Sequence, residues 1–99
     1  MSYKLLYTPI ALIDYKASVN WYAVRSSNAA ENFVTEVKSC IKAICNNPQQ
    51  FKNRYKNFRE TSLKKYPFYI IYFVDEINKV VIVTAIYHHK RNPTHKYKK

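Results

Sequence analysis

Residues 66–74 read YPFYIIYFV, and this stretch decides the fold. Every residue after the proline is β-branched or aromatic, a composition that favours an extended chain within a sheet. A β-strand is therefore predicted over 68–74, entered through a turn at 64–67. Because successive side chains of a strand point to opposite faces, the even-numbered residues should share one face and the odd-numbered residues the other. Both sets are apolar, so this strand needs cover on both faces.

Two further strands are predicted around this one. Residues 58–63 have the mixed polarity of a strand with one solvated face, and 80–87 read VVIVTAIY, with alternating residues expected on opposite faces. The turn at 75–79 contains Asn78, which is expected to take the left-handed conformation that glycine would otherwise supply. The short turns predict an antiparallel meander. Residues 49–57 are polar and basic and are expected to form a loop.

The first half of the chain predicts a strand over residues 3–7 and two helices. Thr8 followed by Pro9 is typical of an N-cap and a first helical position, and Asn28 with Glu31 resembles a capping box that opens the second helix. Apolar residues recurring every three or four positions predict the buried face of each helix. These are Ile10, Ile13, Ala17, Trp21 and Val24 in the first helix, and Ala30, Phe33, Val34, Val37, Ile41 and Ile44 in the second. Trp21 and Phe33 are expected in the core.

These elements predict a single α+β domain over residues 1–99, in the order β-α-α-β-β-β. The two helices form a hairpin packed on one face of an antiparallel sheet, and residues from about 90 to 99 form a basic tail. The hairpin can cover only one apolar face. The other face, which carries Tyr69, Ile71, Phe73 and Tyr87, must curl onto itself, meet a second copy or be covered by a partner.

The composition excludes several classes of function. The chain has no glycine, whereas a phosphate-binding P-loop, a dinucleotide-binding turn and a nucleophile elbow all require it. No apolar run approaches the ~20 residues that span a bilayer, so a cytoplasmic location without a membrane partner is expected. Cys40 and Cys45 lie five positions apart without a zinc-binding pattern around them and are expected to be free thiols. No metal site and no cofactor are predicted.

The charge is unevenly distributed along the chain. The formal net charge is +11. Residues 1–50 contain five basic and three acidic residues, whereas residues 51–99 contain twelve and three. A basic half of this kind indicates an acidic partner, which is nucleic acid, a membrane surface or an acidic protein, with a merely solvated surface as the alternative.

Several motifs, taken in order, resemble the RelE/ParE superfamily of type II toxin–antitoxin toxins. Together they cover residues 3–93. They are Trp21-Tyr22 at the end of the first helix, Ala30-Glu31-Asn32-Phe33 and Asn47-Pro48 around the second, Phe58-Arg59-Glu60, Tyr66-Pro67-Phe68 with its strand, and Tyr87-His88 followed by Arg91-Asn92-Pro93. The proline-led strand and the ending favour the ParE-like branch.

This resemblance implies a toxin that a small cognate antitoxin, encoded beside it, holds inactive. The antitoxin would wrap the toxin and would itself carry the contact with operator DNA. Two activities dominate the superfamily. ParE-like members inhibit DNA gyrase, whereas RelE-like members cut mRNA on the ribosome. Tyr69, Ile71, Phe73 and Tyr87 are the predicted antitoxin-binding residues.

A RelE-like activity would make the chain a metal-free endoribonuclease. Such cleavage needs a base, cations for the phosphate and an acid for the leaving oxygen. The candidate residues for these roles are Tyr87, His88, Arg59, Lys64 and Arg91, with Lys65 and His89 nearby. The pair Tyr87-His88 resembles that of one nuclease branch and would make His88 the acid or base. In a purely structural alternative, His88 closes a strand end on the backbone and Arg59 pairs with Glu60 or Asp75.

One departure from the nuclease pattern favours a non-enzymatic toxin. Nucleases of the superfamily usually carry an arginine just before the hydrophobic stretch that ends in tyrosine, and this chain has Tyr69 there. The loss of one preorganised cation typically lowers the rate by about 10²–10³-fold. Three functions thus stay open in this order: a gyrase inhibitor, a ribosome-dependent mRNA endonuclease and a basic nucleic-acid-binding module.

Overall fold

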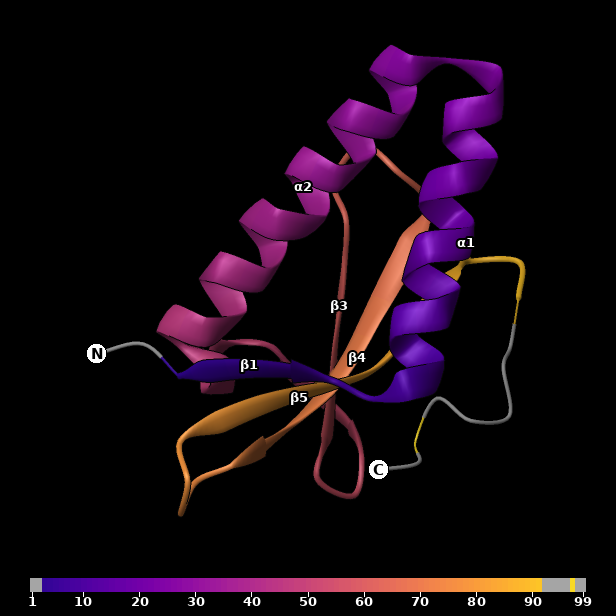
Figure 1. The fold of residues 1–99 in the computed structure, drawn as a ribbon. Coiled ribbons are helices and arrows are strands. Elements are labelled where there is room, and N and C mark those ends of the chain that lie inside the picture. The colour runs from indigo at the N-terminus through magenta and orange to yellow at the C-terminus, as the bar shows by residue number, and fades with distance from the viewer. Residues whose placement is uncertain (1–2, 92–96, 98–99) are drawn as a thin grey trace.

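A computed structural model describes residues 3–91 and Tyr97. The elements, in chain order, are β1 (Lys4–Tyr7), α1 (Pro9–Arg25), α2 (Ser27–Asn46), the 3-10 turn η1 (Pro48–Gln50), β2 (Lys52–Tyr55), β3 (Phe58–Ser62), β4 (Phe68–Asp75) and β5 (Val80–His88). The two helices meet at one end and diverge toward the sheet (Figure 1). This order confirms the predicted α+β fold, with η1 and β2 added.

The five strands form one mixed sheet in the order β1-β5-β4-β3-β2. Strands β3 to β5 form the predicted antiparallel meander, and β2 extends it by one antiparallel strand. Strand β1 pairs in parallel with β5. An entirely antiparallel sheet was therefore the wrong expectation. The first strand joins a partner more than 70 residues away, and no local pattern fixes the direction of such a pairing.

Strand β2 corrects the prediction of a loop over 49–57. All four of its residues are exposed, so the edge strand lacks the alternation of apolar and polar residues that identifies a half-buried strand. It is held by its ladder to β3 and by a tight turn in which Lys56 has a φ of 50°. In the β4–β5 turn the left-handed residue is Lys79, with a φ of 56°, and not Asn78. Asn78 instead hydrogen-bonds the Asp75 carboxylate.

A single residue, Ser26, connects the two helices. As predicted, Thr8 caps α1, and its Oγ1 accepts a hydrogen bond from the Ala11 N–H at 3.2 Å. Ser26 ends α1 by donating its N–H to the Tyr22 carbonyl, and it begins α2 by accepting from the Ala29 N–H at 3.2 Å. The N-cap of α2 is thus Ser26 and not Asn28, which lies inside the helix.

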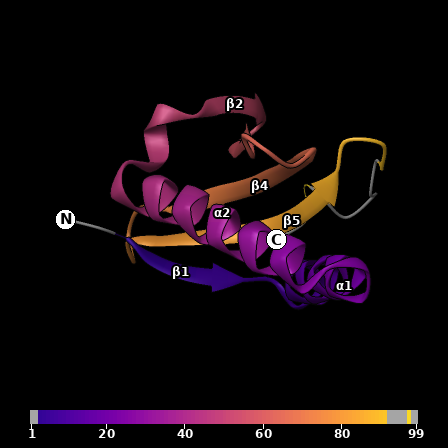
Figure 2. The same ribbon diagram turned by 90° about the horizontal axis from the view of Figure 1, so that it is seen from above.

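The hairpin covers one face of the sheet, as predicted, and Figure 2 shows α2 running across the strands. The predicted stripe of α2 is buried except for Val34, which is half-buried. Phe33, Val37 and Ile44 are fully enclosed. Phe33 lies at the centre of an aromatic cluster, with ring centroids 4.9 Å from Phe68 and 5.0 Å from Tyr22. This cluster joins both helices to β4.

Helix α1 is rotated away from the predicted orientation. The stripe expected in the core is exposed, with Ile13 at 64%, Trp21 at 53% and Val24 at 77% of full exposure. The opposite side, which carries Ala11 and Tyr22, packs on the core. Spacing could not decide between the two sides because both are apolar, and the buried one includes tyrosines whose bulky rings fill the space above the sheet.

A β-bulge in β5 alters the predicted alternation over 80–87. Ile71 pairs with Ala85 while the next residue, Tyr72, pairs with Val83, so Thr84 is an extra residue. Side chains therefore change phase at this point. Val81, Val83 and Ile86 all belong to the helix-side core, whereas Ile82, Ala85 and Tyr87 lie on the other face. In β4 the alternation is as predicted.

The second face of the sheet is covered from within the chain. Phe58, Ile71, Phe73, Ala85 and Tyr87 are all buried in a separate cluster. Tyr97 packs on this cluster, with its ring centroid 5.4 Å from that of Phe58. The sequence left open whether this face is covered by the chain itself, by a second copy or by a partner. In the structure the chain's own side chains cover it.

Replacing Phe33 with alanine should lower the free energy of unfolding by about 3–5 kcal/mol, because the change removes a fully buried ring from the cluster that joins helices to sheet. Chemical denaturation monitored by circular dichroism measures this loss. Ile77 is 93% exposed, so Ile77→Ala should change stability by no more than about 0.5 kcal/mol. Equal losses for both variants would contradict the assigned core.

Candidate functional site

Histidine 88 ends β5 on the helix side of the sheet. Its ring centroid lies 5.4 Å from that of Phe68, and its Nδ1 accepts a hydrogen bond from the Lys90 N–H at 3.1 Å. It lines a groove of about 390 Å³, here called the α1–β5 groove, with Ala17, Ser18, Trp21, Tyr22, Phe68 and Arg91. Of the predicted nuclease residues, only Arg91 shares this groove with His88.

Trp21 forms an exposed wall of the α1–β5 groove. The Arg25 guanidinium lies 3.6 Å above its ring centre and donates to the Trp21 carbonyl at 2.8 Å. A cation stacked on an exposed indole combines apolar area with positive charge. The expectation that Trp21 lies in the core is therefore wrong, because its ring is 53% exposed. The signal for the stacked pair was the four-residue spacing of Trp21 and Arg25 on a helix.

Arg59 acts as a structural tether. Its Nη1 donates to the carbonyls of Phe51 at 2.7 Å and Gln49 at 3.2 Å, and so fixes the segment between α2 and β2. The expected pairing with Glu60 or Asp75 is not observed. Glu60 instead lies 3.8 Å from Arg54. The Arg59 side chain therefore satisfies backbone carbonyls rather than facing an open site.

Lys64 and Lys65 line a second groove, between α2 and β3, of about 710 Å³. The groove also contains Glu36 and Cys40, and the Lys65 N–H donates to the Glu36 carboxylate at 2.8 Å. Burial raises the pKa of the Cys40 thiol to about 11, so this thiol stays protonated at neutral pH. Both cysteines are free, as expected.

Tyr87 lies on the opposite face of the sheet from its neighbour His88. It is buried and faces Tyr69 across the β4–β5 ladder, with ring centroids 5.4 Å apart. Burial, followed by the charge of Glu60, raises the pKa of Tyr87 to about 12, so the phenol keeps its proton at neutral pH. Tyr69 in turn packs against His89 at 4.2 Å. Neither tyrosine contributes a cation to this face.

The predicted antitoxin-binding residues do lie on one face. Ile71, Phe73 and Tyr87 are nevertheless buried there, and Tyr69 is half-buried. Their contact with an antitoxin remains a prediction.

Over residues 3–91 and Tyr97, no three His, Cys, Asp or Glu side chains gather in a way that could hold a metal ion. Within the same residues no helix is long and apolar enough to cross a membrane. Asn92-Pro93 and most of the predicted basic tail lie outside the described residues.

Comparison with known proteins gives one family and several similar structures. The family described as "ParE toxin of type II toxin-antitoxin system, parDE" matches residues 5–93. The chain belongs to the ParE toxin family.

Solved structures of toxins share this fold. A chain of the chromosomal ParDE toxin–antitoxin system from P. aeruginosa superposes with a TM-score of 0.73 at 21% identity, over 88% of this chain and 96% of that one. The isolated E. coli RelE toxin superposes with a TM-score of 0.65 at 19% identity, over 92% of this chain and 88% of that one. A doubly substituted mutant of E. coli RelE in its free state superposes with a TM-score of 0.66 at 18% identity, over 91% of this chain and 86% of that one. No curated protein sequence matches the chain. The ParE family implies a cognate antitoxin as the partner of this toxin.

Arg59→Ala should lower the stability of this ParE-family toxin by about 2 kcal/mol, because two backbone carbonyls lose a charged donor. Arg54→Ala is the matched control. Arg54 is exposed and only loosely paired with Glu60, so its loss should cost less than about 1 kcal/mol. Urea unfolding of both variants measures the difference, and equal values would show that Arg59 is not a tether.

Stability should also fall as the pH rises from about 10 to 12. Burial raises the pKa of both Tyr7 and Tyr87 to about 12, against about 10 in an unfolded chain. In this window the unfolded chain releases phenol protons that the folded chain retains, so unfolding becomes more favourable. Tyr87→Phe should make the decline shallower in urea titrations at each pH. An unchanged slope would contradict the assignment.

Proposed function

We propose that this ParE-family toxin inhibits DNA gyrase through protein contacts and does not cut RNA. The observation that carries the proposal is the dispersal of the candidate nuclease residues. His88 and Arg91 line the α1–β5 groove, Lys64 lines the α2–β3 groove, and Tyr87 is buried on the far face of the sheet. Metal-free cleavage needs a base, a cation and an acid around one phosphate.

The surroundings of Tyr69 give further support. In the nucleases that this chain resembles, an arginine usually stands at this position. Here a tyrosine packs between Tyr87 and His89. Arg59, which lies on β3 opposite Tyr72, is held by two backbone carbonyls. Of two cations that could neutralise a phosphate, one is thus replaced by Tyr69, and the other, Arg59, is bound to backbone carbonyls. A toxin that acts by binding needs neither. Because gyrase acts on chromosomal DNA, this proposal also places the toxin in the cytoplasm.

Cleavage of ribosome-bound mRNA is the second candidate function. Its specific support is that His88 and Arg91 line one groove beside the exposed ring of Trp21. A titratable imidazole, a guanidinium and a stacking surface are groups that RNA-cleaving sites use. A plain nucleic-acid-binding module, the third candidate, rests on the net charge of +11 alone.

Supercoiling assays with the purified full-length toxin test the proposal. Increasing toxin should progressively inhibit the conversion of relaxed plasmid to supercoiled plasmid by gyrase, and a preparation from cells lacking the gene should not. In parallel, primer extension on ribosome-bound mRNA should reveal no new cleavage.

Two results would overturn the proposal. One is normal supercoiling at high molar excess of a toxin whose fold is verified by circular dichroism. The other is mRNA cleavage that disappears in His88→Ala, which would establish the endonuclease instead. Binding to DNA without effect on either assay, and falling steeply with salt, would favour the nucleic-acid-binding module.

A further inference from the structure

The β-hairpin formed by β2 and β3 concentrates positive charge at one edge of the sheet. Residues 51–59 contain four basic residues and no acidic one. Arg59 is held by backbone carbonyls, whereas the other three have exposed side chains. These three, Lys52, Arg54 and Lys56, are here called the edge cations. Figure 2 shows β2 at the margin of the molecule, remote from β1 and α1.

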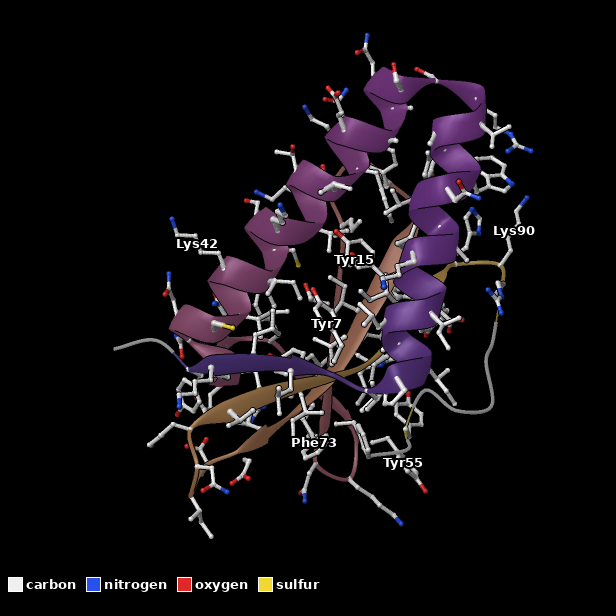
Figure 3. The ribbon with its side chains drawn as sticks, in the orientation of Figure 1. Tyr7, Tyr15, Lys42, Tyr55, Phe73 and Lys90 are labelled. Atoms are coloured by element: carbon white, nitrogen blue, oxygen red, sulfur yellow. The ribbon has the colours of Figure 1, made fainter. Side chains whose placement is uncertain are left out.

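Two stacked aromatic rings lie among the edge cations. Tyr55 is 46% exposed, and its ring centroid lies 4.7 Å from that of Tyr97. The Lys56 ammonium lies 5.4 Å from the centre of the Tyr55 ring. In Figure 3 Tyr55 lies at the end of the molecule remote from α2 and its Lys42. The hairpin thus presents cations beside an aromatic surface that carries a phenol hydroxyl.

The form of this edge disfavours a partner that adds a strand to the sheet. Strand β2 is the last strand on its side of the sheet. Its ladder to β3 shifts register between Asn53 and Tyr55, which leaves Arg54 as an extra residue. A bulge interrupts the row of backbone donors and acceptors, and charged side chains on an edge strand oppose pairing with another chain. The edge therefore suits a partner that is contacted through side chains.

The spacing of the edge cations fits a nucleic-acid backbone. Lys52 and Lys56 are four residues apart, so their Cα atoms are separated by at most about 13–14 Å. A DNA duplex presents a phosphate about every 1.7 Å along its axis, counted over both strands. The three side chains can therefore contact different phosphates at once. The major groove of B-form DNA also admits a two-stranded β-ribbon, whereas that of an A-form RNA helix is too narrow for side chains to read.

Glu60 limits the charge of this surface. Its carboxylate oxygen lies 3.8 Å from Nε of Arg54, across the β2–β3 ladder. The Arg54 side chain is 46% exposed, against 13% for that of Glu60. The guanidinium can therefore reach outward, but the carboxylate offsets part of its charge and repels phosphates nearby. Loss of the Glu60 charge should thus strengthen the binding of a polyanion, whereas loss of an edge cation should weaken it.

We propose that the β2–β3 hairpin binds the phosphate backbone of duplex DNA through Lys52, Arg54 and Lys56. Backbone contacts of this kind position a protein on DNA without reading its sequence. Because gyrase acts on DNA, this contact brings the toxin to the molecule on which its target works and adds to its protein contacts with the enzyme. The choice of DNA as the ligand rests on the proposed inhibition of gyrase.

Fluorescence anisotropy of a short labelled DNA duplex, titrated with the full-length toxin at several salt concentrations, tests the proposal. Three phosphate contacts predict that the logarithm of the binding constant falls with the logarithm of the salt concentration with a slope of about −2.7. Replacing all three edge cations with glutamine should weaken binding about tenfold or more at low salt and should reduce the magnitude of the slope by about 2.7.

Matched variants separate this surface from the net charge of the toxin. Lys16, Lys38 and Lys42 are exposed on the two helices, and replacing all three with glutamine removes the same charge. This control should change the affinity by less than about twofold, because charges more than a Debye length away are screened. Glu60→Gln should strengthen binding by about threefold, whereas Glu31→Gln on α2 should leave it unchanged. Circular dichroism verifies that each variant is folded.

Four results would overturn the proposal. Equal losses in the edge variant and the helix control would show that only the net charge matters. Tighter binding of duplex RNA of the same length would make RNA the ligand. Displacement of the DNA by polyglutamate at an equal concentration of charge would make an acidic protein the occupant. A folded toxin that does not bind DNA would leave the hairpin without this ligand. Supercoiling is measured in a separate assay, so DNA binding can hold while gyrase inhibition fails, or the reverse.

Discussion

Strands β4 and β5 are apolar on both faces, and the remaining elements are arranged to keep both faces from water. The helical hairpin covers one face through Phe33, whose ring contacts both Tyr22 and Phe68. Phe58 and Tyr97 cover the other. Burial of apolar area is the dominant favourable term in folding. A small chain without disulfides depends on covering such a sheet completely.

Elements that are both apolar and locally encoded were predictable from the sequence. Strand β4, the buried stripe of α2 and the Thr8 cap all follow from residues close together in the chain. The orientation of α1 did not follow, because both of its sides are apolar. The side that is buried is the one whose tyrosines, Tyr15 and Tyr22, pack on the core. The bulge at Thr84 was equally hidden, since it arises from the register between two strands.

The candidate site illustrates the same limit. Tyr87 and His88 are adjacent in sequence, which suggested joint action, yet consecutive residues of a strand face opposite sides of the sheet. Arg59 matches a motif of the family, but in the fold its guanidinium donates to the backbone carbonyls of Gln49 and Phe51, in the segment between α2 and β2. Motifs could therefore identify the family correctly while leaving the role of each residue to the three-dimensional arrangement.

The one-residue joint at Ser26 has a consequence for how this protein can change in length. Residues on either side of it are helical, and Ser26 serves both helices. One inserted residue would turn α2 by about 100° about its axis and carry Phe33 out of its cluster. The joint between the helices is therefore a poor place for an added residue, whether it arises by evolution or by design.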